Sequence, residues 1–125
     1  MSTHNKIQKR GIFRGYKAFD RDLCCKGFQF EIGGTYVESR ATLCSYGFHF
    51  CEDPANIEDY YDWKKYKNRC MRFAEVEAVD PITDGHKSVT KQIKIIREIP
   101  RAEFVRLAFH IPPGKRLSEL EMLYE

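Results

Sequence analysis

Cysteine and histidine side chains are the first residues of this chain whose types and spacing suggest chemistry. The candidate metal ligands are Cys24, Cys25, Cys44, His49 and Cys51, and the remaining cysteine is Cys70. Structural zinc sites usually take their ligands in pairs separated by about two to four residues. Cys24 and Cys25 are adjacent, however, and six residues lie between Cys44 and Cys51. The spacing favours thiols that pack as small apolar side chains, and it predicts no metal site.

A nucleophilic cysteine activated by a histidine is the second chemistry that these residue types allow. His49 and Cys51 are two positions apart in the segment 47–51 (GFHFC), so an extended strand places their side chains on the same face. Catalysis would also require a third group that orients the histidine and a set of oxyanion donors. The sequence marks neither of these, and a half-buried histidine in an aromatic strand explains the same pattern.

Alternation of apolar and polar residues predicts most of the elements that hold these side chains. We expect strands over residues 13–19, 27–32, 35–37, 48–51, 70–79 and 88–99, with Phe48 and Phe50 in the core. Gly33 and Gly34 predict a hairpin turn between the second and third of these strands. Helices are expected after Asp53, over 100–109 and over 117–124. The pattern predicts an α+β fold, mainly antiparallel sheet with one or two packed helices and a short C-terminal helix.

The helix that follows the aromatic strand has the clearest start signal in the chain. Asp53 supplies an N-cap oxygen, and Pro54 suits the first helical position because its missing N–H costs nothing there. Ile57, Tyr60 and Tyr61 recur at helical spacing. We therefore expect Ile57 and one or both tyrosines to dock this helix on the sheet.

The same helix gathers five acidic residues between positions 52 and 62, with aromatic residues beside them. Aromatic rings rimmed by charge are common anchors of protein interfaces, so this segment is a candidate partner surface. The residues that would form it are Glu58, Asp59, Tyr60, Tyr61, Asp62 and Trp63. A solvated helix face is the alternative interpretation of the same charges.

The 125 residues fit one domain, and 42% hydrophobic with 31% charged residues is the balance of a folded chain. We expect a flexible basic arm over 1–10 and a single α+β domain over 11–125. The first ten residues lack the apolar run of a secretion signal. No stretch approaches the ~20 apolar residues that span a bilayer. We therefore expect a cytoplasmic protein with reduced thiols and no membrane contact.

The net charge of +3 is too small to indicate nucleic-acid binding by itself, but the positive charge is concentrated near the N-terminus. Lys6, Lys9, Arg10 and Arg14 all precede the first acidic residue and are interleaved with Phe13. Phosphate contacts and base stacking by such residues would make a nucleic-acid-binding module. A disordered basic tail in front of a core strand is the alternative.

Longer segments of the chain resemble a family of small, uncharacterised proteins of phages and prophages. The resemblance is carried by YKAFD at 16–20, GFQFEIGGTY at 27–36, LCSYGFHFCEDPANIEDYY at 43–61, RFAEVEAVDP at 72–81 and KSVTKQIKIIREI at 87–99. Phage proteins of this size are often accessory proteins that bind host proteins, including anti-CRISPR inhibitors of bacterial immunity. The resemblance therefore implies a binding protein that acts in the host bacterial cell.

A second, more local resemblance is to the ADP-ribosyltransferase fold. Gly47-Phe48-His49-Phe50, Tyr60-Tyr61 and Glu75-Val76 follow the order of a strand, a helix end and a strand in that fold. The resemblance implies an enzyme that uses NAD, and its site residues would be Tyr16, His49, Tyr61 and Glu98. Two positions depart from the pattern. Tyr16-Lys17 stands where the fold has a His or Arg, and Glu98 lacks the local pattern of the fold's acidic residue.

The leading hypothesis is a non-enzymatic accessory protein that needs no cofactor and binds a host protein or a protein–nucleic acid complex. Inhibition of a bacterial defence complex such as CRISPR–Cas is the role that this hypothesis assigns. The alternatives are an ADP-ribosyltransferase-like enzyme that uses NAD and a nucleic-acid-binding module. We expect a monomer or a weak dimer in each case.

Overall fold

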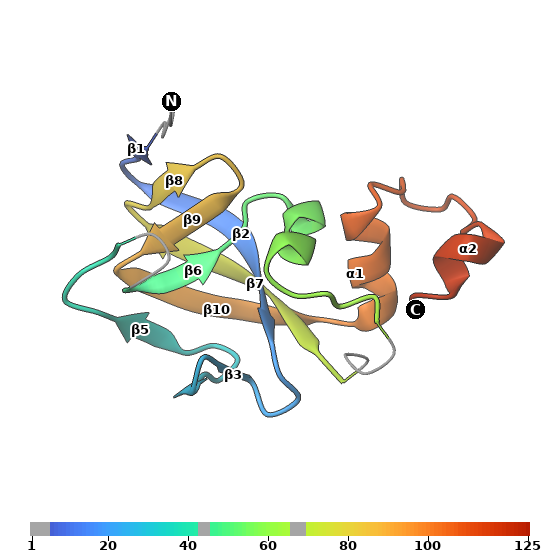
Figure 1. The fold of residues 1–125 in the computed structure, drawn as a ribbon, viewed down its shortest axis with the longest axis horizontal. Coiled ribbons are helices and arrows are strands. Elements are labelled where there is room, and N and C mark those ends of the chain that lie inside the picture. The colour runs from blue at the N-terminus through green and yellow to red at the C-terminus, as the bar shows by residue number, and fades with distance from the viewer. Residues whose placement is uncertain (1–5, 43–45, 66–69) are drawn as a thin grey trace.

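The computed structural model describes residues 6–42, 46–65 and 70–125 of the chain. Within these residues the strands pair antiparallel in two four-stranded sheets and one small hairpin (Figure 1). The first sheet has the order β1 (Ile7–Gln8), β8 (Ile82–Asp84), β9 (Lys87–Thr90), β6 (Phe48–Phe50). The second has the order β2 (Ile12–Phe19), β7 (Arg72–Val79), β10 (Gln92–Ile99), β5 (Thr35–Val37), and the hairpin pairs β3 (Cys24–Cys25) with β4 (Phe28–Gln29). The expected predominance of antiparallel sheet is confirmed.

The helices of the described residues are short. They are the 3₁₀ helix η1 (Pro54–Asp59), α1 (Arg101–Ala108) and α2 (Glu119–Met122), and Figure 1 shows α1 and α2 at one end of the molecule. The Asp53 side chain caps η1 by accepting a hydrogen bond from the Ala55 N–H, as the sequence predicts. None of the helices in the described part of the chain is long and apolar enough to cross a membrane.

The main core lies between the two sheets and is built from residues of β2, β6, β7 and β10. The sheets approach closely where β2 crosses β6. There the backbone N–H of Tyr16 donates to the Cys51 carbonyl at 2.7 Å, and the Cys51 N–H donates back at 2.9 Å. Gly15 permits this approach, because a Cβ at that position would lie 2.5 Å from the Phe50 ring. Phe48 and Phe50 are buried in this core as expected.

A second core lies between the second sheet and the helices η1 and α1. Its centre is Trp63, whose ring centroid lies 5.9 Å from that of Phe73 and 5.1 Å from that of Phe104. Trp63 is only 1% exposed. The prediction that Trp63 anchors a partner surface is therefore wrong, because the indole is already used to attach the helices to the sheet. Ile57 is buried here, and Tyr60 and Tyr61 pack against the cluster, as predicted.

The strand expected over 88–99 is divided between the two sheets. β9 pairs with β6 and β8, and β10 pairs with β7 and β5, with Lys91 between them. The register of β10 against β7 then shifts between Ile95 and Arg97. A shift of one residue reverses the side-chain faces. Ile93 and Ile95 consequently belong to the main core, whereas Ile99 belongs to the core under the helices.

The hairpin predicted at Gly33-Gly34 is not formed. β4 pairs with β3, and the chain after it turns to β10, where the Gly33 N–H donates to the Ile95 carbonyl at 2.7 Å. β5 continues this pairing along β10. The Gly34 N–H donates to the Glu31 carbonyl at 3.0 Å, so a turn does form here, but β4 and β5 on either side of it do not pair with each other.

The expectation of a flexible arm is wrong for residues 6–10, while residues 1–5 lie outside the described residues. β1 pairs with β8, and the Lys9 N–H donates to the Pro81 carbonyl at 2.8 Å. The Lys9 ammonium is also 2.5 Å from a carboxylate oxygen of Glu52. The open edge of the first sheet at β8 provides these backbone partners, and local composition carries no signal for such an edge.

Candidate functional site

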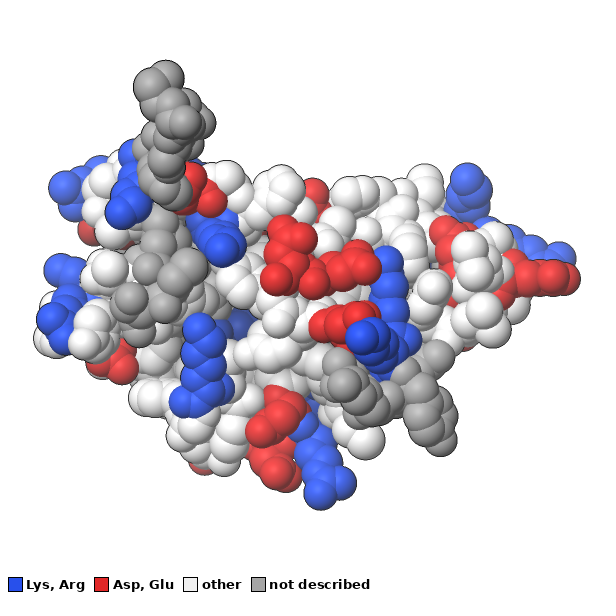
Figure 2. All heavy atoms as spheres, viewed as in Figure 1, with Lys and Arg blue, Asp and Glu red and all other residues white. Residues whose placement is uncertain are grey.

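A pocket of about 250 Å³ opens between β6, the β3–β4 hairpin and η1. Its lining comes from β2, from the hairpin, from the segment 46–51 and from the residues at the end of η1. In Figure 2 this face of the molecule is hollowed to the left of its centre, with Lys and Arg side chains nearby. Segments far apart in sequence thus form one concave site, which is the usual form of a small-molecule site.

Aromatic rings form one wall of this pocket. The Phe28 ring centroid lies 4.7 Å from that of Phe30 and 5.4 Å from that of Phe48. Tyr36 supports Phe28 and Phe30 from behind, at 5.5 and 5.1 Å. Phe30 and Phe48 are buried, whereas Phe28 is 38% exposed. The wall therefore has a fixed base and one accessible ring against which a flat apolar group can pack.

Lys17 lies in the pocket from the side of β2 and is only 5% exposed. Its Nζ donates a hydrogen bond to the His49 carbonyl oxygen at 2.5 Å and lies 5.5 Å from the centroid of the Phe30 ring. Among the described residues, no carboxylate lies within ion-pairing distance of this amine. Burial lowers the pKa of Lys17, because the charged form loses its hydration, and the nearby Cys25 thiol opposes this shift.

A thiol and a phenol stand beside this amine. The Cys25 Sγ and the Tyr61 hydroxyl oxygen are 3.0 Å apart, and both side chains line the pocket. Burial raises the pKa of Tyr61, and its contact with Cys25 raises it further, so that the phenol keeps its proton at neutral pH. The pocket thus contains an amine, a thiol and a protonated phenol.

The proposed pair of Cys51 and His49 is present in the pocket but not in an activated form. Burial raises the pKa of the Cys51 thiol from 9.0 to about 12, and the nearby Asp59 contributes in the same direction. Burial also lowers the pKa of His49 from 6.5 to about 4, with further lowering by the positive charges of Lys26, Lys17 and Lys87. A nucleophilic cysteine is a thiolate, whereas this thiol keeps its proton at neutral pH.

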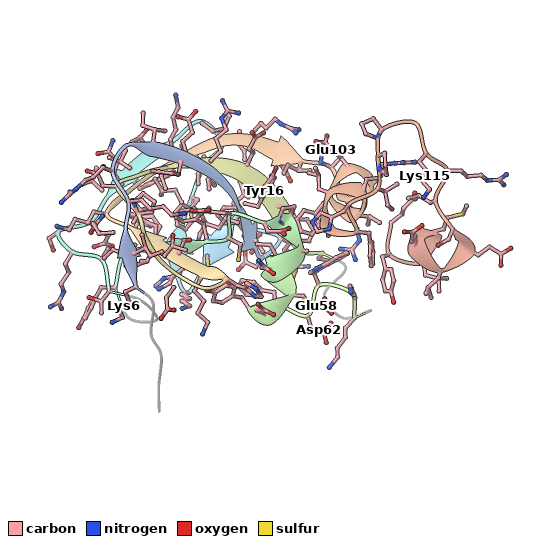
Figure 3. All side chains as sticks on the ribbon, turned by 90° about the horizontal axis from the view of Figure 1, so that it is seen from above. Lys6, Tyr16, Glu58, Asp62, Glu103 and Lys115 are labelled. Atoms are coloured by element: carbon pink, nitrogen blue, oxygen red, sulfur yellow. The ribbon has the colours of Figure 1, made fainter. Side chains whose placement is uncertain are left out.

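The four residues of the ADP-ribosyltransferase hypothesis are not brought together. His49 and Tyr61 line the pocket, but Tyr16 and Glu98 do not. Tyr16 is on the other face of β2, where burial and the carboxylate of Glu75 raise its pKa (Figure 3). Glu98 receives two hydrogen bonds from the Arg72 guanidinium, at 2.6 and 2.7 Å, which lower its pKa. Residues that cannot reach a common substrate cannot share a catalytic step.

The acidic residues of the candidate partner surface are exposed, and each one has a basic side chain beside it. Lys64 lies 3.0 Å from Glu58, His86 lies 3.1 Å from Asp59, and Lys65 lies 3.4 Å from Asp62. Figure 3 shows Glu58 and Asp62 on the same side of the molecule. Together with the half-buried Tyr60 and Tyr61, they form a paired, mixed-charge surface rather than a field of one sign, and the buried Trp63 is not part of it.

The basic residues near the N-terminus are also largely matched by carboxylates. Arg10 lies 3.9 Å from Asp80, and Arg14 lies 2.7 Å from Glu75 and 3.6 Å from Glu77. Lys9 contacts Glu52, whereas Lys6 is exposed. Cations that already neutralise carboxylates of the same chain contribute less to a phosphate-binding surface.

A comparison with protein-family models identifies the family of this chain. The family described as "Domain of unknown function (DUF7666)" matches residues 13–107. The chain belongs to the DUF7666 family. Neither the curated proteins nor the solved structures include a significant match to it. The phage accessory role and the inhibition of host defence stay predictions.

The matched segment of the DUF7666 chain contains every residue that lines the pocket and ends near the end of α1. Within the described residues, no group of three or more His, Cys, Asp and Glu side chains gathers as metal ligands do. Cys44, one of the candidate ligands, lies outside the described residues. The described cysteines are free thiols.

In this DUF7666 chain the sequence pattern did not identify Lys17 as a site residue, and it gave Cys25 only as a candidate metal ligand. A signal for Lys17 was present in the alternation of β2. Phe13, Gly15, Lys17 and Phe19 share one face, which is the face toward the core, so a lysine stands in an apolar series. No local signal predicted the contact of Cys25 with Tyr61, because it depends on where the β3–β4 hairpin folds against η1.

Proposed function

We propose that this protein acts by binding a small organic acid with a flat, apolar body in the pocket beside β6. The observation that carries the proposal is the combination, in one concave site, of an aromatic wall with the side chains of Lys17 and Lys26. Small-molecule sites are typically apolar clefts with a few well-placed polar groups that orient the ligand. The proposal keeps the class of the leading sequence hypothesis, a protein that acts by binding.

The size and shape of the pocket support a ligand with a single ring. A volume of about 250 Å³ lies just below the range for organic ligands, which begins at roughly 300 Å³. The exposed ring of Phe28 offers a flat contact at the entrance, and Phe30 and Phe48 close the wall behind it. A ligand with one aromatic ring matches this wall in edge-to-face or offset contact.

The charges around the pocket support an acidic ligand. Lys26 lines the site at the turn of the hairpin, and the positive charges of Lys26 and Lys87 both lower the pKa of His49. The carboxylate that also lines the pocket belongs to Glu38, which is exposed. Cationic groups therefore outnumber acidic groups at the site, and a ligand carboxylate gains from this local potential.

A ligand series that differs only in charge tests this proposal. Phenylacetate, phenylacetamide and 2-phenylethylammonium share one ring and one short arm, and their affinities for the protein are compared by isothermal titration calorimetry. We expect phenylacetate to bind most tightly. Lys26→Glu should weaken phenylacetate at least about fivefold, which corresponds to roughly 1 kcal/mol.

Lys94→Glu is the matched control, because Lys94 is an exposed lysine of β10 on the other side of the second sheet. This variant makes the same charge change and should leave the affinity for phenylacetate unaltered. Equal affinities for the three ligands, or equal effects of the two variants, would show that the proposed charge recognition is wrong.

A further inference from the structure

We infer that the Lys17 amine reacts with its ligand, by condensing with the carbonyl carbon of an aldehyde or ketone held in the pocket. The inference rests on the proposed function, because the same pocket binds the ligand. It adds a covalent step and a substrate class, namely an aromatic acid that also carries a carbonyl group.

The position of the nitrogen is the first support. Lys17 lines the pocket while its stem passes between the two sheets, and its Nζ is held by a hydrogen bond to the His49 carbonyl oxygen at 2.5 Å. A neutral amine that donates one hydrogen to a carbonyl oxygen keeps its lone pair free. The hydrogen bond therefore fixes the nitrogen without consuming the electrons that attack a carbonyl carbon.

The surroundings of the nitrogen are the second support. The groups that act on it are the thiols of Cys25 and Cys51 and the ammonium of Lys26, and none of these is a carboxylate. The rings of Phe19 and Phe30 lie 5.9 and 5.5 Å away. Burial lowers the pKa of Lys17, which increases the neutral fraction at neutral pH. Lysines that form imines are activated in this way.

The step balances with no oxidant or further reactant. The lone pair of Nζ attacks the carbonyl carbon, a C–N bond forms as the C=O π bond breaks, and one amine proton passes to the carbonyl oxygen to give a neutral carbinolamine. The hydroxyl group then leaves as water while the second amine proton is lost and a C=N bond forms. Tyr61, whose protonated phenol lines the same pocket, is the group available to give a proton to the leaving hydroxyl.

Reductive trapping of the imine tests the inference. Phenylpyruvate, which has one ring, one carboxylate and a ketone, is incubated with the full chain and sodium cyanoborohydride. Peptide mapping by mass spectrometry then gives the labelling rate of each lysine. We expect Lys17 to be labelled at least tenfold faster than Lys94, and phenylacetate to slow labelling at Lys17 but not at Lys94.

The pH dependence provides a readout that a purely structural lysine would not give. Exposed lysines of ordinary pKa gain about tenfold in neutral amine for each pH unit between 7 and 9. Because the pKa of Lys17 is lowered, we expect its labelling to increase less than that of exposed lysines over this range. Tyr61→Phe should slow labelling of Lys17 several-fold, and Lys17→Met should remove that adduct while leaving the adducts at exposed lysines.

The outcomes separate this inference from the proposed function. If phenylacetate binds and Lys17 is labelled no faster than Lys94, the covalent step is wrong and the binding function stands. If neither phenylacetate nor phenylpyruvate binds, both proposals are wrong. Because wild-type protein supplies the decisive rates, the test does not depend on the folding of any variant.

Discussion

The two faces of β2 treat positive charge in opposite ways. On the outer face, Arg14 lies 2.7 Å from the carboxylate of Glu75. On the inner face, only three residues further along, Lys17 is buried against aromatic rings and a backbone carbonyl. Arg14 is paired with a carboxylate of the same chain, whereas no carboxylate of the described residues pairs with the Lys17 amine. The outer charges are thus used within the structure, whereas the inner amine is available to the ligand that we propose.

The outer face continues this pattern beyond β2. Arg97 of β10 lies 2.9 Å from Glu75 and also pairs with Glu103 of α1. These two carboxylates raise the pKa of Arg97. The ion pairs connect β2, β7, β10 and the first turn of α1 across the sheet surface. They are exposed to solvent, so each contributes little to stability despite its good geometry.

Gly15→Ala should produce the largest change in stability, because it disturbs the inner face at its tightest point. An added Cβ would lie 2.5 Å from the Phe50 ring and 2.7 Å from the Cys51 carbonyl oxygen. We expect a loss of about 2–3 kcal/mol in the free energy of unfolding, measured by urea denaturation. A loss below about 0.5 kcal/mol would show that the two sheets are not held at this distance.

Acidification should destabilise the inner face through His49. Its pKa falls from 6.5 to about 4 in the folded protein, so the unfolded chain binds more protons between these values. Stability is therefore retained above pH 6.5 and lost as the pH falls toward 4. After allowance for solvent around the half-exposed ring, we expect a loss on the order of 2 kcal/mol.

Urea melts between pH 6.5 and 5 measure the slope with which the free energy of unfolding falls as the pH is lowered. His49→Gln should flatten the slope, whereas His86→Gln, at an exposed histidine beside Asp59, should preserve it. If the slope persists in His49→Gln, another group takes up the proton on unfolding and the assignment to His49 is wrong.

Lys17→Met should not destabilise the protein, although it removes the proposed reacting group. The variant relieves the cost of burying an amine but leaves the His49 carbonyl without that donor. We expect the free energy of unfolding to stay the same or to rise by up to about 1 kcal/mol, while reductive labelling at position 17 is lost. A loss above about 2 kcal/mol would show that Lys17 is mainly a structural brace.

Arg97→Met should have the smallest effect. It removes two exposed ion pairs of the outer face and should cost about 0.5–1 kcal/mol by urea denaturation, less at high salt. The affinity for phenylacetate should not change. A large change in that affinity would show that the ion pairs of the outer face influence the pocket, and that the two faces do not act independently.

Local patterns in the amino-acid sequence specified much of this fold. Alternation identified β2, β6 and β7 and placed Phe48 and Phe50 of β6 in the core, and the Asp53-Pro54 pair placed the start of η1. α1 and the capped α2 begin close to the expected positions. These features depend on neighbouring residues, such as cap hydrogen bonds and the period of two in a strand, so they can be read from short segments.

Tertiary structure decided which strands pair and which residues meet. The backbone of residues 33–34 pairs with β10, β1 finds the edge of β8, and Trp63 fills the space between the sheet and α1. Tyr16 and Lys17 are adjacent in sequence, yet only Lys17 lines the pocket. Alternation shows that they point in opposite directions but not which direction leads to a cavity. That depends on the approach of β6 and the β3–β4 hairpin, and such long-range packing has no signal in a local pattern.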